Sequence, residues 1–343
     1  MTFRGLIDQR RARLLLQAVL RSGRVAHAYL FVGPSGVGRM TAARAFAQAL
    51  LCAAGGDDAC DRCTSCRKVG AGAHPDLRVL TPGRSEAGAD RRAVGIDQVR
   101  ELKREAAYPP YEARWKVFIV EHAEAMRAEA ANSLLKVLEE PPPGVVIILI
   151  TESAEAVLPT LASRAQAVRF SFVPAPEIAQ ALTARCGVAP ERARYLAALA
   201  GGRVGAALAD ARSGEEPFER RREVVATLAA LRSADVLVPL AAAEAVARQK
   251  EDIERWLDIA LLWIRDVAVW QETQDPALLV NLDAVQEIAA WAGGASGVRL
   301  RRAAAAIEEA KSHLRRNLNP RLVLEALFVR IARHADRDGV RRP

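Results

Sequence analysis

The chain has 343 residues, which is too long for one ordinary hydrophobic core, so two or three domains are expected. Apolar residues make up 51% of it, but no uninterrupted apolar run reaches about 18 residues, so we expect no membrane span. The N-terminal residues MTFRG contain no apolar core of the kind a secretory signal has, so we expect no such signal. The formal net charge of +8 favours an anionic partner such as DNA, although a GC-rich genome would enrich arginine in the same way. These features predict a cytoplasmic protein whose thiols stay reduced.

A strand, a glycine-rich turn and a helix follow one another near the N-terminus. Residues 5–23 have a helical apolar face, 27–32 resemble a short strand, and 42–51 are expected to be helical. Between the last two lies GPSGVGRMT, residues 33–41. This order is typical of a P-loop, in which backbone N–H groups hold phosphate at the positive end of a helix.

The loop keeps the glycines of the P-loop pattern and departs from its reactive residues. Gly33, Gly36 and Gly38 supply the turn, but Arg39 stands where the pattern has Lys, and the next position is Met rather than Ser or Thr. Thr41 has a hydroxyl, but one helical position later it points about 100° away. Two interpretations stay open: a plain turn that never meets nucleotide, and a weak nucleotide site without hydrolysis.

Four cysteines follow within 15 residues, at Cys52, Cys60, Cys63 and Cys66. Four thiolates can close a tetrahedral structural zinc site, and a reducing compartment argues against disulfides. An iron–sulfur cluster is the alternative, although the further Cys-Pro of the common ferredoxin run is absent. Zinc is the predicted metal, with a structural role.

The next segments alternate between strands and helices. Residues 77–80 form a predicted strand, 83–94 a mobile loop, and 96–106 a helix capped by Asp97. Three further strand-like runs occupy 116–121, 145–151 and 168–172, and a helix over 125–140 ends at three prolines. This alternation predicts an α/β fold with a parallel sheet and crossover helices.

Two polar sites border these strands. P-loop ATPases end the strand before the catalytic helix with an Asp for Mg²⁺ and a Glu for the attacking water, but here the positions are Glu121 and His122. Two separate regions therefore lack the groups that hydrolysis needs. Ser163 and Arg164 precede the last strand, where an arginine can reach a neighbouring subunit's nucleotide as an arginine finger. A surface arginine without such a role is the default alternative.

The remainder of the chain is predicted to be helical. A break near residue 173 starts a small helical region over 174–214, and 215–343 follow as a second one, with a disordered tail from 337. Trp256 and Trp263 lie at helical spacing, which favours a buried core over a nucleotide-stacking surface.

Several of these motifs together resemble the bacterial clamp-loader AAA+ family. They are HAYLF (27–31), the altered glycine loop, the cysteine quartet, VEHAE (120–124), ANSLLKVLEEP (131–141) and Ser163-Arg164. The resemblance implies a RecA-like AAA+ domain with a zinc module (1–173, cysteines within 52–66), a helical lid (174–214) and a helical collar (215–343). Ala165 replaces the cysteine that usually follows the Ser-Arg pair, without a change in charge.

The resemblance also implies a function. The chain would be a non-hydrolysing subunit of the loader within a DNA polymerase III holoenzyme, giving Arg164 to a neighbouring ATPase subunit. Its partners would be gamma/tau-type ATPase subunits, the delta subunit, the sliding clamp and primer–template DNA at the replisome. Two alternatives stay open: an ATP-hydrolysing gamma/tau-type subunit, and a DNA-binding adaptor that acts alone.

Overall fold

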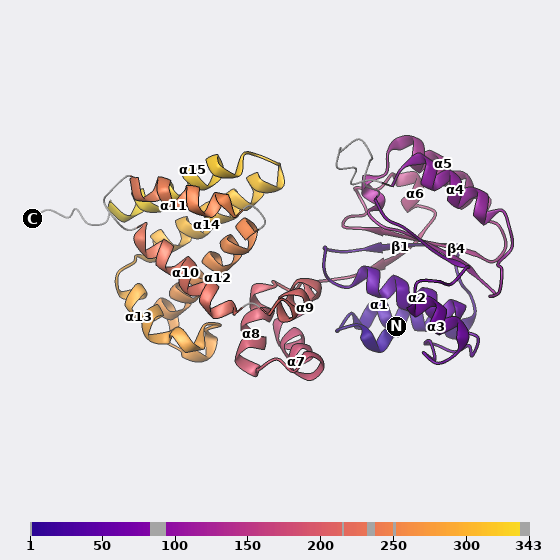
Figure 1. Cartoon of the computed structure of the whole chain (residues 1–343), viewed down its shortest axis with the longest axis horizontal. Helices are drawn as coiled ribbons and strands as arrows, with labels where there is room; N and C mark the ends of the chain where they lie inside the picture. The colour runs from indigo at the N-terminus through magenta and orange to yellow at the C-terminus, as the bar shows by residue number, and fades with distance from the viewer. Residues whose placement is uncertain (1, 83–93, 215, 232–236, 250–251, 337–343) are drawn as a thin grey trace, which may run out of the picture. The chain divides into compact units, whose positions relative to one another are not determined.

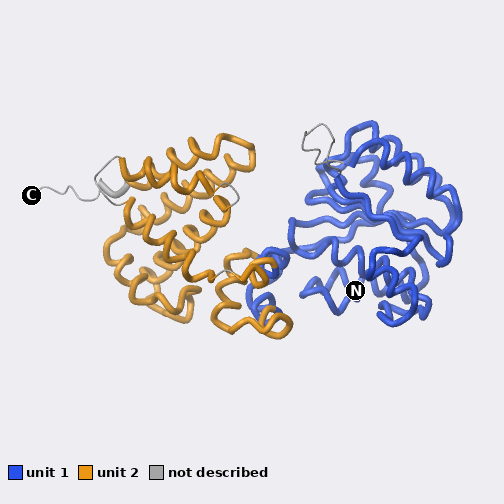
Figure 2. Tube along the Cα trace, in the orientation of Figure 1, with its two compact units in different colours: residues 1–181, 202–208 blue, residues 182–201, 209–343 orange. Residues whose placement is uncertain are grey.

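The chain divides into two compact units in a computed structural model that describes residues 2–82, 94–214, 216–231, 237–249 and 252–336. Unit 1 comprises residues 1–181 and 202–208, and unit 2 comprises 182–201 and 209–343 (Figure 2). The divisions fall inside two helices, α7 (Ala175–Cys186) and α9 (Val204–Arg212). The three-domain division at 173 and 214 stays a prediction.

A five-stranded parallel sheet forms the centre of unit 1 (Figure 1). Its order is β2 (Leu77–Leu80), β3 (Lys116–Val120), β4 (Val145–Thr151), β1 (Ala28–Val32) and β5 (Gln166–Arg169). All seven residues of β4 are buried, as expected for a parallel strand covered on both faces. The predicted α/β parallel-sheet fold is confirmed.

Helices cover both faces of the sheet. On one face lie α1 (Arg10–Ser22), α2 (Arg39–Leu51) and α3 (Thr64–Gly70), and on the other α4 (Ile96–Ala106), α5 (Ala128–Glu139) and α6 (Pro159–Ala162) (Figure 1). Because side chains alternate along each strand, the sheet feeds two separate cores. Two 3₁₀ turns, Phe3–Gly5 and Ala123–Ala125, precede α1 and α5.

Unit 2 is helical throughout its described part, as predicted. Its helices are α8 (Pro190–Leu199), α10 (Pro217–Ala230), α11 (Leu237–Arg248), α12 (Ile253–Thr273), α13 (Val285–Gly293), α14 (Gly297–Arg315) and α15 (Pro320–Asp336), with 3₁₀ turns at Pro276–Leu278 and Leu282–Ala284. Trp256 and Trp263 of α12 are buried, which confirms the core interpretation. None of the helices described is long and apolar enough to cross a membrane.

Several predicted boundaries are wrong. The first helix begins at Arg10 rather than at residue 5, because Asp8 and Gln9 adopt left-handed backbone angles (φ 55° and 51°) that a right-handed helix cannot contain. The last strand covers 166–169 rather than 168–172, and α5 starts at 128 rather than 125.

The cap of α4 is also corrected, since it is Gly95 and not Asp97. The side chain of Gln98 accepts the Gly95 N–H at 3.0 Å, while Asp97 sits within the first turn. The loop predicted over 83–94 lies almost wholly outside the described residues, as does the tail from 337.

Candidate functional site

The glycine-rich loop between β1 and α2 has backbone geometry that only glycine tolerates. A Cβ on Gly33 would lie 2.4 Å from the carbonyl oxygen of Phe170, and Gly36 and Gly38 have φ values of 77° and 101°. Gly38 is the N-cap of α2, whose first turn contains no acidic residue. The loop therefore keeps the shape of a phosphate-binding turn at the positive end of a helix.

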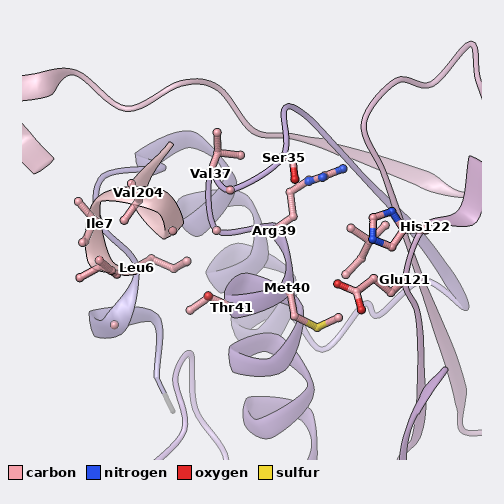
Figure 3. Close-up of a pocket in the computed structure, with 16 residues that line it drawn as sticks. Leu6, Ile7, Ser35, Val37, Arg39, Met40, Thr41, Glu121, His122 and Val204 are labelled. Atoms are coloured by element: carbon pink, nitrogen blue, oxygen red, sulfur yellow. The ribbon is translucent and has the colours of Figure 1, made fainter. Parts of the chain in front are cut away.

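A small cavity of about 260 Å³ lies against this loop (Figure 3). It is lined by the loop and the first turn of α2, by Glu121 and His122, and by apolar residues that include Leu6, Ile7 and Val204. Gly205 donates its N–H to the carbonyl oxygen of Gly36 at 2.8 Å, which closes one side. The volume is slightly below the range of about 300–1,000 Å³ that is usual for ligand pockets.

Arg39, at the position of the P-loop lysine, is paired within the chain. Its side chain is only 8% exposed, and one terminal nitrogen lies 3.9 Å from Oε1 of Glu152 at the end of β4. The other terminal nitrogen is buried, with no hydrogen-bond partner among the described residues. Burial lowers the pKa of Arg39, and the negative charges of Glu152, Glu124 and Glu121 oppose that shift. The sequence did not predict the pairing with Glu152.

The Thr41 hydroxyl and the Glu121 carboxylate, the two groups that could share Mg²⁺, lie apart. In Figure 3 the Met40 side chain extends toward Glu121, whereas Thr41 faces the other side of the helix, near Leu6. This separation agrees with the 100° rotation that the helical period requires.

The end of β3 lacks the geometry of a catalytic acidic pair. The backbone N–H of Glu121 donates to the Leu80 carbonyl oxygen at 2.9 Å, which continues the sheet by one residue. His122 then turns into the left-handed region, with φ at 53°. Its Nδ1 lies 3.4 Å from Oε1 of Glu124, so the ring faces a neighbouring carboxylate within the same turn.

The four cysteines converge on one point beside α3. Their Sγ atoms all lie within 4.8 Å of one another, and the Cys52–Cys63 and Cys60–Cys66 pairs are each 4.0 Å apart. These distances exclude a disulfide, which requires about 2.05 Å. They approach the edge of about 3.8 Å that a tetrahedron of zinc–sulfur bonds would have. The donor set therefore fits a four-coordinate metal ion of the zinc type.

The surroundings of the sulfurs favour the thiolate at Cys60 and disfavour it at Cys66. The backbone N–H groups of Cys60, Cys63 and Cys66 each donate to the sulfur of the preceding cysteine in the cluster, at 3.4 Å. Hydrogen bonds from the Arg62 and Cys63 backbone lower the pKa of Cys60 to about 6. Burial raises the pKa of Cys66 to about 12, so this thiol must lose its proton when a metal binds.

Ser163 and Arg164 lie between α6 and β5, at the amino end of an edge strand. Arg164 is 37% exposed and pairs through Nη2 with Oε1 of Glu139 at 2.9 Å. Its Nη1 donates to the Thr160 carbonyl oxygen at 3.0 Å. Sequence analysis predicted neither contact: Glu139 belongs to a helix more than twenty residues upstream, and the bond to Thr160 depends on how the chain turns between α6 and β5.

Arg164 and the glycine loop lie at opposite ends of the parallel strands, Arg164 at the amino ends and the loop at the carboxyl ends. Strands β1 and β5 are parallel, with Tyr29 beside Gln166, and the loop begins at Gly33 after the carboxyl end of β1. At about 3.3 Å per residue, the four residues from Tyr29 to Gly33 span about 13 Å. An arginine at the amino ends of the strands therefore cannot contact a phosphate held in the loop of its own chain.

Comparison with known families matches most of the chain. A model described as DNA polymerase III, delta subunit, covers residues 8–174. A second, described as DNA polymerase III, delta subunit, C terminal, covers residues 215–333.

Individual relatives agree with this match. The DNA polymerase III subunit delta′ of Bacillus subtilis is 31% identical over 330 residues, covering 94% of this chain and 95% of the relative. The delta′ subunit of Pseudomonas aeruginosa is 42% identical over 142 residues, 40% of this chain and 41% of that protein. The gamma/tau subunit of Mycobacterium tuberculosis H37Rv is 31% identical across 96% of this chain, which spans 61% of that protein.

Solved structures with related chain traces are more distant. A gamma subunit-related protein of Thermotoga maritima gives a TM-score of 0.41 at 17% identity, covering 93% of this chain and 99% of the other. The RuvB Holliday junction branch migration motor of the same organism gives 0.44 at 13% identity, with 84% of each chain covered.

Proposed function

The chain belongs to the family of DNA polymerase III delta′ subunits, and from that premise we propose that it is a clamp-loader subunit that hydrolyses no ATP and donates Arg164 to a neighbouring ATP site. The observation that carries the proposal is the position of Arg164. Arg164 is exposed at the amino ends of the parallel strands, whereas the chain's own glycine loop lies at their carboxyl ends. A nucleotide that meets this guanidinium must be bound by another chain.

The altered glycine loop supports the absence of hydrolysis. Arg39 is already paired with Glu152, and its planar fork is a poor substitute for the compact ammonium of a P-loop lysine. Thr41 and Glu121 lie apart in the cavity, so the chain offers no hydroxyl–carboxylate pair for Mg²⁺ there.

We propose the partners of this assembly from the family to which the relatives belong. They are gamma/tau-type ATPase subunits and a delta subunit, with the sliding clamp and primer–template DNA as the objects on which the assembly acts. The net charge of +8 is consistent with an assembly that meets DNA. We place this assembly in the cytoplasm, at the replisome.

The purified chain is expected to show no ATP turnover above background, alone or with DNA, because the P-loop lysine and the Mg²⁺-binding hydroxyl are both absent. Steady-state phosphate release with Mg-ATP measures this, and co-purification with gamma/tau-type and delta subunits tests assembly. Turnover by the lone chain would instead identify a gamma/tau-type ATPase. Failure to assemble, together with strongly salt-dependent DNA binding by the lone chain, would identify a separate DNA-binding adaptor.

A further inference from the structure

The guanidinium of Arg164 is held from two directions. Its Nη2 lies 2.9 Å from Oε1 of Glu139, the last residue of α5, in an ion pair, and its Nη1 donates to the Thr160 carbonyl oxygen in α6 at 3.0 Å. An ion pair to one helix and a hydrogen bond to another together restrict the position and orientation of the group. A long side chain at an exposed site would otherwise sample many rotamers.

These contacts leave most of the guanidinium available. An arginine has five N–H donors; among the described residues one of them donates a hydrogen bond, to Thr160, and Nη2 makes the ion pair, so donors remain for a further acceptor. Both side chains of the ion pair are partly exposed, at 37% for Arg164 and 49% for Glu139. An ion pair this exposed is weak and cannot compete with a triphosphate for the arginine. It can orient the arginine without retaining it.

We propose that Glu139 is a positioning residue that presets the Arg164 guanidinium for the phosphates of a nucleotide bound by a neighbouring subunit. This inference rests on the proposed function of Arg164. When a neighbouring subunit covers the surface and removes water, the attraction between Glu139 and Arg164 strengthens, so the orientation is best defined where the reaction occurs. Orientation before the reaction lowers the entropy that must be lost in the transition state.

The test uses the reconstituted loader with this chain as wild type, Glu139→Ala, Arg164→Ala and the double variant. DNA-stimulated ATP turnover is measured against ATP concentration, and gel filtration establishes that each variant assembles. Glu139→Ala is expected to lower kcat about threefold to fivefold at unchanged KM, since the neighbour binds ATP with its own residues. In the Arg164→Ala background the same substitution should have no further effect.

A neighbouring glutamate provides the matched control. Glu140 is exposed and forms no ion pair among the described residues, so Glu140→Ala should leave kcat unchanged. Glu139→Gln keeps an acceptor oxygen and should lose less than Glu139→Ala, and added salt should reduce the difference from wild type.

The outcomes separate the inference from the function on which it rests. An unchanged or raised kcat for Glu139→Ala would overturn the positioning role, and a raised value would mean that Glu139 restrains Arg164. An equal loss in the presence and absence of Arg164 would reduce Glu139 to a structural contact. If Arg164→Ala itself has no effect, the proposed function fails first.

Discussion

Replacing Arg164 with alanine is expected to slow ATP hydrolysis about 10³-fold or more at the neighbouring site that this chain is proposed to complete. An arginine supplied in trans stabilises the charge that develops during phosphoryl transfer, and its contribution is on the order of 10³ to 10⁵. Arg164 has the required exposure, and the hydrogen bond and ion pair that it makes among the described residues leave N–H donors for a phosphate. Rapid-quench measurement of the hydrolysis of pre-bound ATP by the assembled loader would then show that a fraction of the bound ATP remains after the other sites have hydrolysed theirs.

Arg169 provides the matched control, because it is an exposed arginine at the carboxyl end of β5, the strand that Arg164 precedes. With Arg169→Ala, the whole of the pre-bound ATP should still be hydrolysed at the wild-type rate. Arg164→Lys keeps the charge but loses the planar fork, so it should recover only part of the rate. Full hydrolysis by an intact assembly carrying Arg164→Ala would show that this residue is an ordinary surface arginine.

The sequence predicted those parts of the fold that depend on local pattern. The apolar run at 145–151 became the fully buried strand β4, and the spacing of four cysteines anticipated a cluster with all sulfurs within 4.8 Å. Each of these two sequence patterns is contained within its own short segment of the chain. A buried parallel strand and a metal-binding turn have few alternatives once their composition is given.

The features that the sequence missed depend on contacts between distant segments. The left-handed turn at Gln9, which delays α1, is held by a hydrogen bond from its side chain to the carbonyl oxygen of Ser171 at 2.6 Å. The pairing of Arg39 with Glu152 likewise joins distant segments, the first turn of α2 and the residue that follows β4. Local propensity cannot anticipate a conformation that a partner more than one hundred residues away selects.

Removing the metal from the cysteine cluster is expected to destabilise unit 1 by about 3 kcal/mol or more, a fall of about 6–12 °C in Tm for a domain of this size. Cys52 and Cys66 are buried in the same core as Leu50 and Leu51, so the cluster continues the hydrophobic core at the end of α2. Without the ion, thiolates such as that of Cys60, whose pKa is about 6, would repel one another there. Thermal unfolding with and without a strong chelator measures the difference.

Elemental analysis and two cysteine variants complete this test. We expect about one zinc ion per chain, lost in Cys66→Ala but retained in Cys186→Ser, because Cys186 lies on α7 outside the cluster. Metal affinity should rise with pH, since the Cys66 thiol, whose pKa is about 12, must release its proton on binding.

A structural metal site would be contradicted if the purified chain contained no metal and if Cys66→Ala had the same Tm as wild type. Iron with sulfide in place of zinc would keep the site and change the identity of its occupant. In either case Arg164 lies in a different part of unit 1, so the trans-acting role and the metal site can be tested independently.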